Sequence, residues 1–486
     1  MVFQVFYTQT IIASSTKQAI NMAVTSRKLY VFMFFVGVFF IPFNSFEGIQ
    51  FLGEFKGEHG AHFLFLAFII LLYDALKSKR FSIPYTSFVF QLLVIFLAWC
   101  VLATVFNLPS IYESYYKRTG GINRFIRQYF ALILSSFLLF LLYWNVVVKM
   151  EKQQILIQIR RVFLYSFIAV SVYAFFEILY LSFGFYPAYK ILKFFEYFPF
   201  VEFTQDSSNR VSSVCFEAPA LATFLISAAG WMFSYILTNK GPLKYIPTAV
   251  VLILTYFSGS RTALIVIVFQ LIVFLSIILS KQQRIRAIGY SIATVFVLSF
   301  LILISNGDKI VKDVEKKIES LDFRGNLKTN ISNKSRFGIQ YANFVVFTQN
   351  PIVGVGFGQQ GYYARHYYPS WAVRDNFEFK NLYLDKTNPM FPPGYNMYIR
   401  LLAETGIIGF LLFIYLLYIV VHLTKKRIKE STNQIDKTLA IILLISFSGF
   451  ILNWLQLDTF RMYGFWLSLA ILIKLSKKQN IPVDEK

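Results

Sequence analysis

A short polar segment in the middle of the chain carries residues suited to acid–base and phosphate chemistry. Arg210 and Glu217 lie seven residues apart, and Pro219 follows two residues after Glu217. Proline favours the first turn of a helix, so Glu217 is predicted at a helix N-terminus, where an acidic residue is favourable. Two interpretations stay open: a helix cap that pairs with Arg210, or a general base that faces an external cleft.

Arg261 opens an apolar segment directly after Ser258, Gly259 and Ser260. A helix N-terminus already carries partial positive charge, so an arginine there is favourable when both face an anion such as a phosphate. The alternative is an arginine that extends toward lipid headgroups. The tight, polar turn before Arg261 favours the anion-binding interpretation.

Charged residues also lie within long apolar segments, where they are costly and usually face a cavity or a partner. These are Glu177, Arg400 and Glu404. Arg400 and Glu404 are four residues apart and share a helix face, so a mutual ion pair is one interpretation and a site is the other. The glycine-rich run at 354–358 lacks the lysine and the preceding strand of a phosphate-binding loop, and is interpreted as a flexible turn.

The composition identifies the elements that must position these residues. Only 15% of the 486 residues are charged and 56% are hydrophobic, with a mean hydropathy of +0.56. A soluble domain carries about 25% charged residues. The aromatic share of 19% excludes disorder and a coiled coil. The chain is therefore predicted to be an all-α polytopic membrane protein.

A bilayer core needs about 20 apolar residues per helix. Because 243–280 is too long for one span, residues 258–261 are predicted to turn the chain. Twelve spans are predicted: 29–46, 59–75, 83–106, 129–148, 162–184, 219–238, 243–258, 261–280, 287–305, 397–421, 437–455 and 460–475.

The short loops on one side of these spans are basic, which predicts that side to be cytoplasmic. The net charge of +22 is thereby assigned to topology, and nucleic acid is excluded as a partner. The predicted organisation is a cytoplasmic N-terminal segment (1–28), nine spans (29–305), a long, partly helical periplasmic loop (306–396), three spans (397–475) and a cytoplasmic tail (476–486). An amphipathic surface helix is predicted near 311–321.

Metal and disulfide chemistry find little support in the sequence. Cys100 lies in an apolar run and Cys215 in a polar one, and the four histidines are scattered. These positions form no zinc or iron–sulfur pattern. No carboxylate cluster suited to Mg²⁺ stands out, so a metal-independent reaction without a cofactor is predicted.

An ordered set of motifs resembles the O-antigen ligase/polymerase family, including the Wzy-type polymerases. The set comprises Ser260-Arg261-Thr262-Ala263-Leu264, then Arg336, then Asn350-Pro351-Ile352-Val353-Gly354-Val355-Gly356-Phe357-Gly358, and then the segment from Tyr395 and Asn396 through Arg400 and Glu404 to Gly409. The resemblance covers about 255–420. The stretch from Arg210 to Pro219 also resembles the Arg…Glu-Pro element of polysaccharide polymerases, with Ala218 as an inserted residue.

The resemblance implies a membrane-embedded, GT-C-like glycosyltransferase at the periplasmic face of the bacterial inner membrane. Its substrates would be glycans on undecaprenyl pyrophosphate, and a chain-length regulator protein is an implied partner. Arg261 and Arg336 match arginines that bind the pyrophosphate. Tyr395 stands where the ligase branch usually has a histidine, which favours a polymerase.

The expected roles follow from these residues. Fixed arginines stabilise a leaving pyrophosphate, and a carboxylate takes the proton of the acceptor hydroxyl. Glu217 is the first candidate for this base and Glu404 the second. The residues expected to contact substrate are Arg210, Tyr395, Asn396, Arg400 and Glu404.

Two other functions stay open. One is a ligase that transfers finished glycan to lipid A-core. The other is a transporter or flippase for lipid-linked sugars, for which repeated halves and charges near the midplane would be expected. The chain shows no internal repeat, and its charges gather at the predicted external ends of helices. This pattern favours an enzyme.

Overall fold

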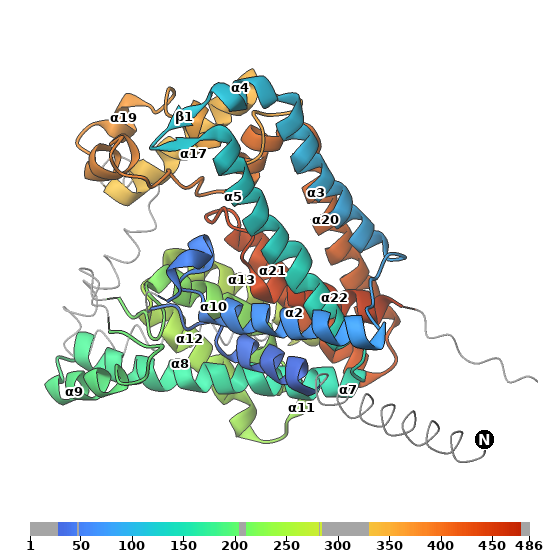
Figure 1. Cartoon of the computed structure of the whole chain (residues 1–486). Helices are drawn as coiled ribbons and strands as arrows, with labels where there is room; N and C mark the ends of the chain where they lie inside the picture. Colours follow the sequence, from blue (N-terminus) through green and yellow to red (C-terminus); the bar gives the residue numbers. More distant parts are fainter. Residues whose placement is uncertain (1–27, 46–47, 204–209, 281, 284–329, 478–486) are drawn as a thin grey trace, which may run out of the picture.

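The computed structural model describes residues 28–45, 48–203, 210–280, 282–283 and 330–477 (Figure 1). In these residues the chain is helical, apart from its loops and one hairpin in which β1 (Tyr115–Tyr116) pairs antiparallel with β2 (Thr119–Gly120). The predicted all-α polytopic architecture is confirmed for this part of the chain. The predicted span 287–305 and the predicted helix near 311–321 lie outside it.

Eight helices are long and apolar enough to cross a membrane, and three shorter apolar helices accompany them. The eight are His59–Ser78 (α2), Phe88–Phe106 (α3), Gly121–Val147, Lys152–Leu181, Ala218–Thr238, Arg261–Ile278 (α13), Met397–Glu430 (α20) and Gln434–Asn453 (α21). The shorter ones are Lys28–Phe39, Pro242–Phe257 and Tyr463–Ser476 (α22).

Several of these helices are divided by changes of helix type or, at Ser234, by a single turn residue. The divisions give α5 (Gly121–Ile133), η2 (Leu134–Leu138) and α6 (Leu139–Val147); α7 (Lys152–Gln154), η3 (Ile155–Ile159) and α8 (Arg160–Leu181); α10 (Ala218–Phe233) and α11 (Tyr235–Thr238); and η4 (Pro242–Tyr245) and α12 (Ile246–Phe257).

The predicted boundaries at 129 and 162 are wrong by eight to ten residues. The helices begin at Gly121 and Lys152 instead, because polar first turns that contain Arg124 or Gln154 continue the helix beyond its apolar part. Hydropathy marks where the apolar stretch of a helix begins, whereas the backbone hydrogen bonds can start earlier.

The predicted turn at 258–261 is confirmed. α12 ends at Phe257 and α13 begins at Arg261. The side chain of Ser260 accepts a hydrogen bond from the backbone N–H of Ala263 (3.3 Å), so Ser260 is the N-cap of α13.

Short elements lie together at one end of the molecule. Figure 1 shows α4 (Leu108–Glu113), β1, α17 (Ile331–Gln349) and α19 (Ser370–Val373) gathered above the long helices. The remaining short elements are η1 (Gln50–Phe55), α9 (Tyr186–Phe195), α18 (Gln360–Ala364) and η5 (Phe379–Tyr383). The hydroxyl of Tyr116 donates to the carbonyl of Tyr383 (2.8 Å), which joins the hairpin to the long loop.

α21 lies at the centre of the packing, against α10, α13, α20 and α22. Gly230 of α10 lies so close to α21 that a Cβ there would be 2.7 Å from the carbonyl oxygen of Ile442. Such small residues let helix backbones approach within a membrane. The amide Nε2 of Gln270, from α13, donates to the carbonyls of Ile226 and Ile445 (both 3.0 Å) and links three helices.

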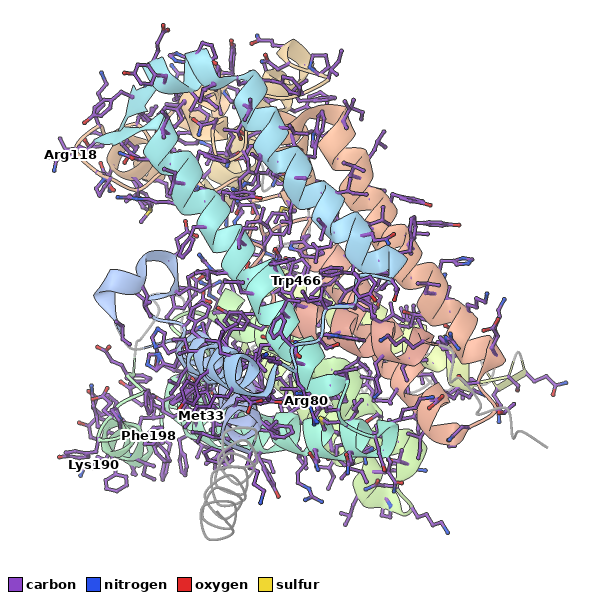
Figure 2. The ribbon with its side chains drawn as sticks, turned by 45° about the vertical axis from the view of Figure 1, so that its right-hand side comes forward. Met33, Arg80, Arg118, Lys190, Phe198 and Trp466 are labelled. Atoms are coloured by element: carbon purple, nitrogen blue, oxygen red, sulfur yellow. The ribbon has the colours of Figure 1, made fainter. Side chains whose placement is uncertain are left out.

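Large apolar side chains fill the interior of the helix bundle, and most of the described charged side chains lie at its edges. Figure 2 shows Trp466 deep between the helices and Arg118 and Lys190 at the outer edges. Trp466 is 1% exposed, whereas both cations are exposed. A continuous core therefore holds the helices that carry the polar groups described below.

α20 is broken at Gly406, whose φ of 64° and ψ of −169° are not helical. Such a break leaves backbone groups without their partners in the helix. The loop and a neighbouring helix replace them, since the N–H of Ile407 donates to the carbonyl of Pro351 (2.8 Å) and the indole of Trp99 donates to the carbonyl of Thr405 (2.9 Å).

The glycine-rich run 354–358, predicted as a flexible turn, supplies the remaining partners and is held by hydrogen bonds. The N–H of Val355 donates to the backbone carbonyl of Ala403 (3.0 Å), and the N–H of Gly356 donates to the backbone carbonyl of Glu404 (2.9 Å). The run is buried against α20. It fixes the helix end that carries Arg400 and Glu404.

Candidate active site

A buried carboxylate holds the segment 210–217. Glu177, in α8, is fully buried and accepts hydrogen bonds from the N–H groups of Ser212 (2.9 Å) and Ser213 (2.6 Å). The charge predicted to need a partner therefore finds it in backbone amides. These bonds tie the segment that begins with Arg210 to the spanning helix α8.

The same segment is bound to the turn between α12 and α13. The N–H of Val211 donates to the carbonyl of Phe257 (3.3 Å). A Cβ on Gly259 would lie 2.9 Å from Cγ of Arg210, so the arginine stem lies directly over that glycine. Gly259 also has a φ of 60°, which favours glycine. The turn thus brings Arg210 close to Arg261.

Arg336 comes from a different element, the second turn of α17. Its guanidinium lies 5.1 Å from the ring centroid of Tyr395, a cation–π contact. Nε of Arg336 is buried and has no hydrogen-bond partner among the described residues. An unsatisfied buried donor is costly, so this group is suited to receive a ligand.

Tyr395 is held in an uncommon conformation beside Arg336. Its φ is 54°, its hydroxyl lies 2.7 Å from that of Tyr383, and its carbonyl accepts from Nε2 of Gln340 (3.3 Å). Burial raises the pKa of Tyr395, and the Tyr383 hydrogen bond and the charge of Arg336 oppose that shift. Tyr395 is therefore a neutral hydroxyl at ordinary pH. Constrained residues of this kind gather at functional sites.

Two other arginines lie within electrostatic range of Arg261. The positive charges of Arg336 and Arg210 both act on Arg261. We call Arg210, Arg261 and Arg336 the arginine cluster. Like charges repel when they are brought together, and an anion between them reverses that energy. Guanidinium groups also match the geometry of phosphate oxygens.

Glu217 lies on the segment that begins with Arg210 and directly precedes α10, as predicted. Its carbonyl accepts from the N–H groups of Ala220 (3.0 Å) and Leu221 (3.2 Å), and the residue is exposed. Glu217 is thus joined through its carbonyl to the first turn of α10, and through the chain of segment 210–217 to Arg210.

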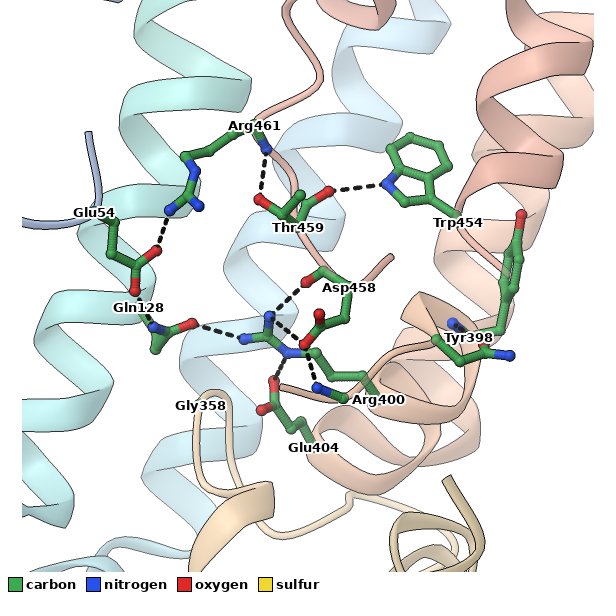
Figure 3. A network of polar contacts seen from close by, with 12 residues as sticks. Glu54, Gln128, Gly358, Tyr398, Arg400, Glu404, Trp454, Asp458, Thr459 and Arg461 are labelled. Carbon is green, nitrogen blue, oxygen red and sulfur yellow. Dashed lines mark hydrogen bonds and ion pairs between the residues drawn. The ribbon is translucent and has the colours of Figure 1, made fainter. Parts of the chain in front are cut away.

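Arg400 and Glu404 form a second polar group (Figure 3). Nε of Arg400 lies 3.1 Å from Oε2 of Glu404, which confirms the predicted ion pair. Arg400 also lies 3.6 Å from Oδ2 of Asp458, donates to the Asp458 carbonyl (2.6 Å) and donates to Oε1 of Gln128 (2.9 Å). Arg400 is 7% exposed and Glu404 fully buried. This pairing compensates both charges inside the protein.

Asn396 begins the helix that carries this pair. Its side-chain oxygen accepts from the N–H groups of Tyr398 (3.0 Å) and Ile399 (3.2 Å), so it caps α20. Asp458 accepts from the N–H of Gly394 (2.6 Å) on the other side. The segment 394–400 therefore links Tyr395, beside the arginine cluster, to the buried ion pair.

The predicted site residues fall into two neighbouring groups. The arginine cluster lies with Tyr395, and Asn396, Arg400 and Glu404 follow on the same segment. Sequence reasoning missed Arg124 and Asp458, which face the second group. It also missed Arg461, although an arginine inside the predicted span 460–475 was a usable signal.

Residues 246–414 match a family model described as O-antigen ligase. No curated protein matches the sequence. The matched region extends from the start of α12 into α20 and contains Arg261, Arg336 and Tyr395. The chain is thus a multi-pass membrane protein that carries a domain of the O-antigen ligase/polymerase family.

Proposed function

We propose that the protein is a polysaccharide polymerase of the O-antigen type. It transfers a growing glycan from undecaprenyl pyrophosphate to the next lipid-linked repeat unit at the periplasmic face. The family domain supports glycan transfer from lipid-linked substrates. The observation that carries the proposal is that Arg210 and Arg336 both act electrostatically on Arg261, with Arg336 against the ring of Tyr395.

In this reaction, an acceptor hydroxyl oxygen attacks the anomeric carbon of the donor glycan. The bond between that carbon and the pyrophosphate oxygen breaks, and the leaving oxygen takes the electron pair. The arginine cluster stabilises the negative charge that develops on the pyrophosphate. Because the donors are fixed before the reaction, they need no costly reorganisation in the transition state.

Glu217 accepts the proton of the attacking hydroxyl. It stands at the N-terminus of α10, where the partial positive charge of the helix end is favourable for a carboxylate. It positions the hydroxyl and takes its proton as charge builds on the leaving group. Glu404 is less suited, because it is fully buried beside Arg400.

Polymerase is favoured over ligase by the residue at position 395. The family resemblance associates a histidine at this place with the ligase branch, whereas this chain has a tyrosine held by Tyr383 and Arg336. The ligase remains the second candidate, since the matched family model carries that description. The third, a flippase, has no specific observation in its favour.

The proposal also covers the fold, the membrane location, the cofactor requirement and the partner protein. The enzyme has a GT-C-like fold, lies in the bacterial inner membrane with both termini cytoplasmic, and uses no metal or cofactor. A chain-length regulator protein is its proposed partner. Metal independence is tested with EDTA, which leaves the rate unchanged if the proposal is right.

The function is tested by deleting the gene and separating the cell-surface glycans on a gel. Loss of the polymerase leaves a single repeat unit attached to lipid A-core, because the ligase still acts. Core without any repeat unit contradicts the proposal and indicates a ligase or flippase. Complementation with the wild-type gene is the control.

A further inference from the structure

A polar cavity of about 310 Å³ lies beside the buried Arg400 pair. It is open on one side and is lined by η1, α5, η2, residues 357–360, the segment 391–400, and the connection between α21 and α22. Six lining residues matter for its chemistry: Arg124, Gln128, Gln360, Phe391, Arg400 and Asp458. The volume is at the small end of the range for ligand pockets, about 300–1,000 Å³, and suits one or two sugar rings.

The charges around this cavity are largely compensated. Arg400 pairs with Glu404 and Asp458. Arg461, at the other edge, pairs with Glu54 (2.5 Å) and with Glu58. Figure 3 shows the Arg461–Glu54 pair joined through Gln128 to Arg400, Glu404 and Asp458. A site of balanced charges favours a neutral ligand with many hydroxyl groups, in contrast to the arginine cluster.

Hydrogen-bonding groups and an aromatic surface are both present in the cavity. Oε1 of Gln360 is buried without a hydrogen-bond partner among the described residues, and Gln360 is only 3% exposed. The guanidinium of Arg124 lies 3.6 Å from the ring centroid of Phe391, and its Nε donates to the carbonyl of Gly358 (2.8 Å). The remaining guanidinium N–H groups can donate to sugar oxygens.

The cavity adjoins the arginine cluster through one short segment. Pro393 lines the cavity, and Tyr395, two residues further, lies beside Arg336. Two residues of extended chain span at most about 7 Å. The N–H of Gly394, between them, is fixed by Asp458 (2.6 Å). A ligand in the cavity is therefore a close neighbour of an anion held by the cluster.

We propose that this cavity is the acceptor subsite, which binds the neutral sugar that carries the attacking hydroxyl. The inference rests on the proposed polymerase function. Arg124 and Gln360 donate and accept hydrogen bonds with sugar hydroxyls, and Phe391 supplies the apolar wall. The donor's pyrophosphate occupies the arginine cluster, so the two substrates meet beside the 393–395 segment.

The experiment measures binding of two separate probes to the purified full-length protein in lipid nanodiscs. One probe is the lipid-free oligosaccharide released by mild acid from the cell's own lipid-linked repeat unit, followed by saturation-transfer NMR. The other is inorganic pyrophosphate, followed by phosphorus NMR. The variants are Arg124→Ala, Gln360→Ala and Arg261→Ala.

The matched control is Arg365→Ala, which removes an arginine stacked on Tyr116 (4.5 Å) outside both sites. We expect Arg124→Ala and Gln360→Ala to weaken oligosaccharide binding about tenfold and to leave pyrophosphate binding unchanged. Arg261→Ala is expected to show the opposite pattern. Thermal unfolding of each variant checks the fold, and Arg124→Lys replaces Arg124→Ala if the latter unfolds.

Two results overturn the inference: a wild-type protein that does not bind the oligosaccharide, or binding weakened by Arg261→Ala but not by the cavity variants. The polymerase proposal is judged separately, by polymer formation from lipid-linked units. If the wild-type protein forms polymer and the cavity variants bind the oligosaccharide as well as the wild type does, only the acceptor subsite is refuted. A protein that transfers the glycan of lipid-linked units only to lipid A-core loses the polymerase assignment, and an oligosaccharide bound in its cavity would then be donor glycan.

Discussion

The backbone of Gly259 lies directly beneath the side chain of Arg210, where a Cβ would be 2.9 Å from Cγ of the arginine. This contact joins the segment that carries Arg210 and Glu217 to the turn that carries Arg261. The arginine cluster therefore depends on a glycine that bears no functional group of its own. Position 259 also has a φ of 60°, so both the close contact with Arg210 and the backbone conformation favour glycine there.

Gly259→Ala is expected to lower the transfer rate at least tenfold, because the new methyl group displaces Arg210. Gly184→Ala is the matched control: Gly184 has a φ of 68° but no atom within 4 Å of its Cβ position. Both variants carry backbone strain of about 1 kcal/mol. Initial rates with purified protein separate them, and equal rates for the two variants would contradict the role of the Gly259–Arg210 contact.

Glu217→Gln keeps the shape of the side chain but cannot accept a proton. We expect this variant to bind lipid-linked substrate and to form almost no polymer, a loss of about 10²- to 10⁴-fold. Glu404→Gln is expected to keep partial activity, because Asp458 still lies 3.6 Å from Arg400. Polymerisation assays with purified variants decide, and a near wild-type rate for Glu217→Gln moves the base elsewhere.

Tyr395 supplies a pH prediction. Burial raises its pKa above the ordinary value of about 10, so the hydroxyl stays neutral between about pH 6 and 9. Tyr395→Phe should lower the rate severalfold without changing the shape of the pH profile in that range. Because the folded protein prefers the neutral form, stability should fall above about pH 10 in the wild type and fall less in the variant. A new titration below pH 9 would contradict this.

The predicted topology is open to cysteine labelling. Cys100 and Cys215 are both fully buried, so the background from native thiols is small. A membrane-impermeant maleimide is expected to label Lys380→Cys in intact spheroplasts and to label Lys426→Cys only after lysis. Labelling of position 426 but not 380 before lysis would reverse the assigned orientation.

The helices and the turn at 258–261 could be predicted from local sequence, because apolar length and a polar break determine them. The break at Gly406 could not, since its backbone groups are satisfied by residues 351–356, which lie some 50 positions away. Arg124 and Asp458 were missed for the same reason. Their proximity to Arg400 depends on how α5 and the α21–α22 connection pack, and no local pattern encodes that arrangement.

The central claim is that Arg261 and Arg336 stabilise a leaving pyrophosphate during polymerisation. The most direct measurement incubates purified protein with lipid-linked repeat units and follows polymer length and undecaprenyl pyrophosphate release. Wild-type protein and Arg365→Ala should produce a polymer ladder. Arg261→Ala and Arg336→Ala should lose at least about 10²-fold in rate, with lysine substitutions restoring little because a bidentate contact is lost. A normal ladder from either alanine variant would contradict the account.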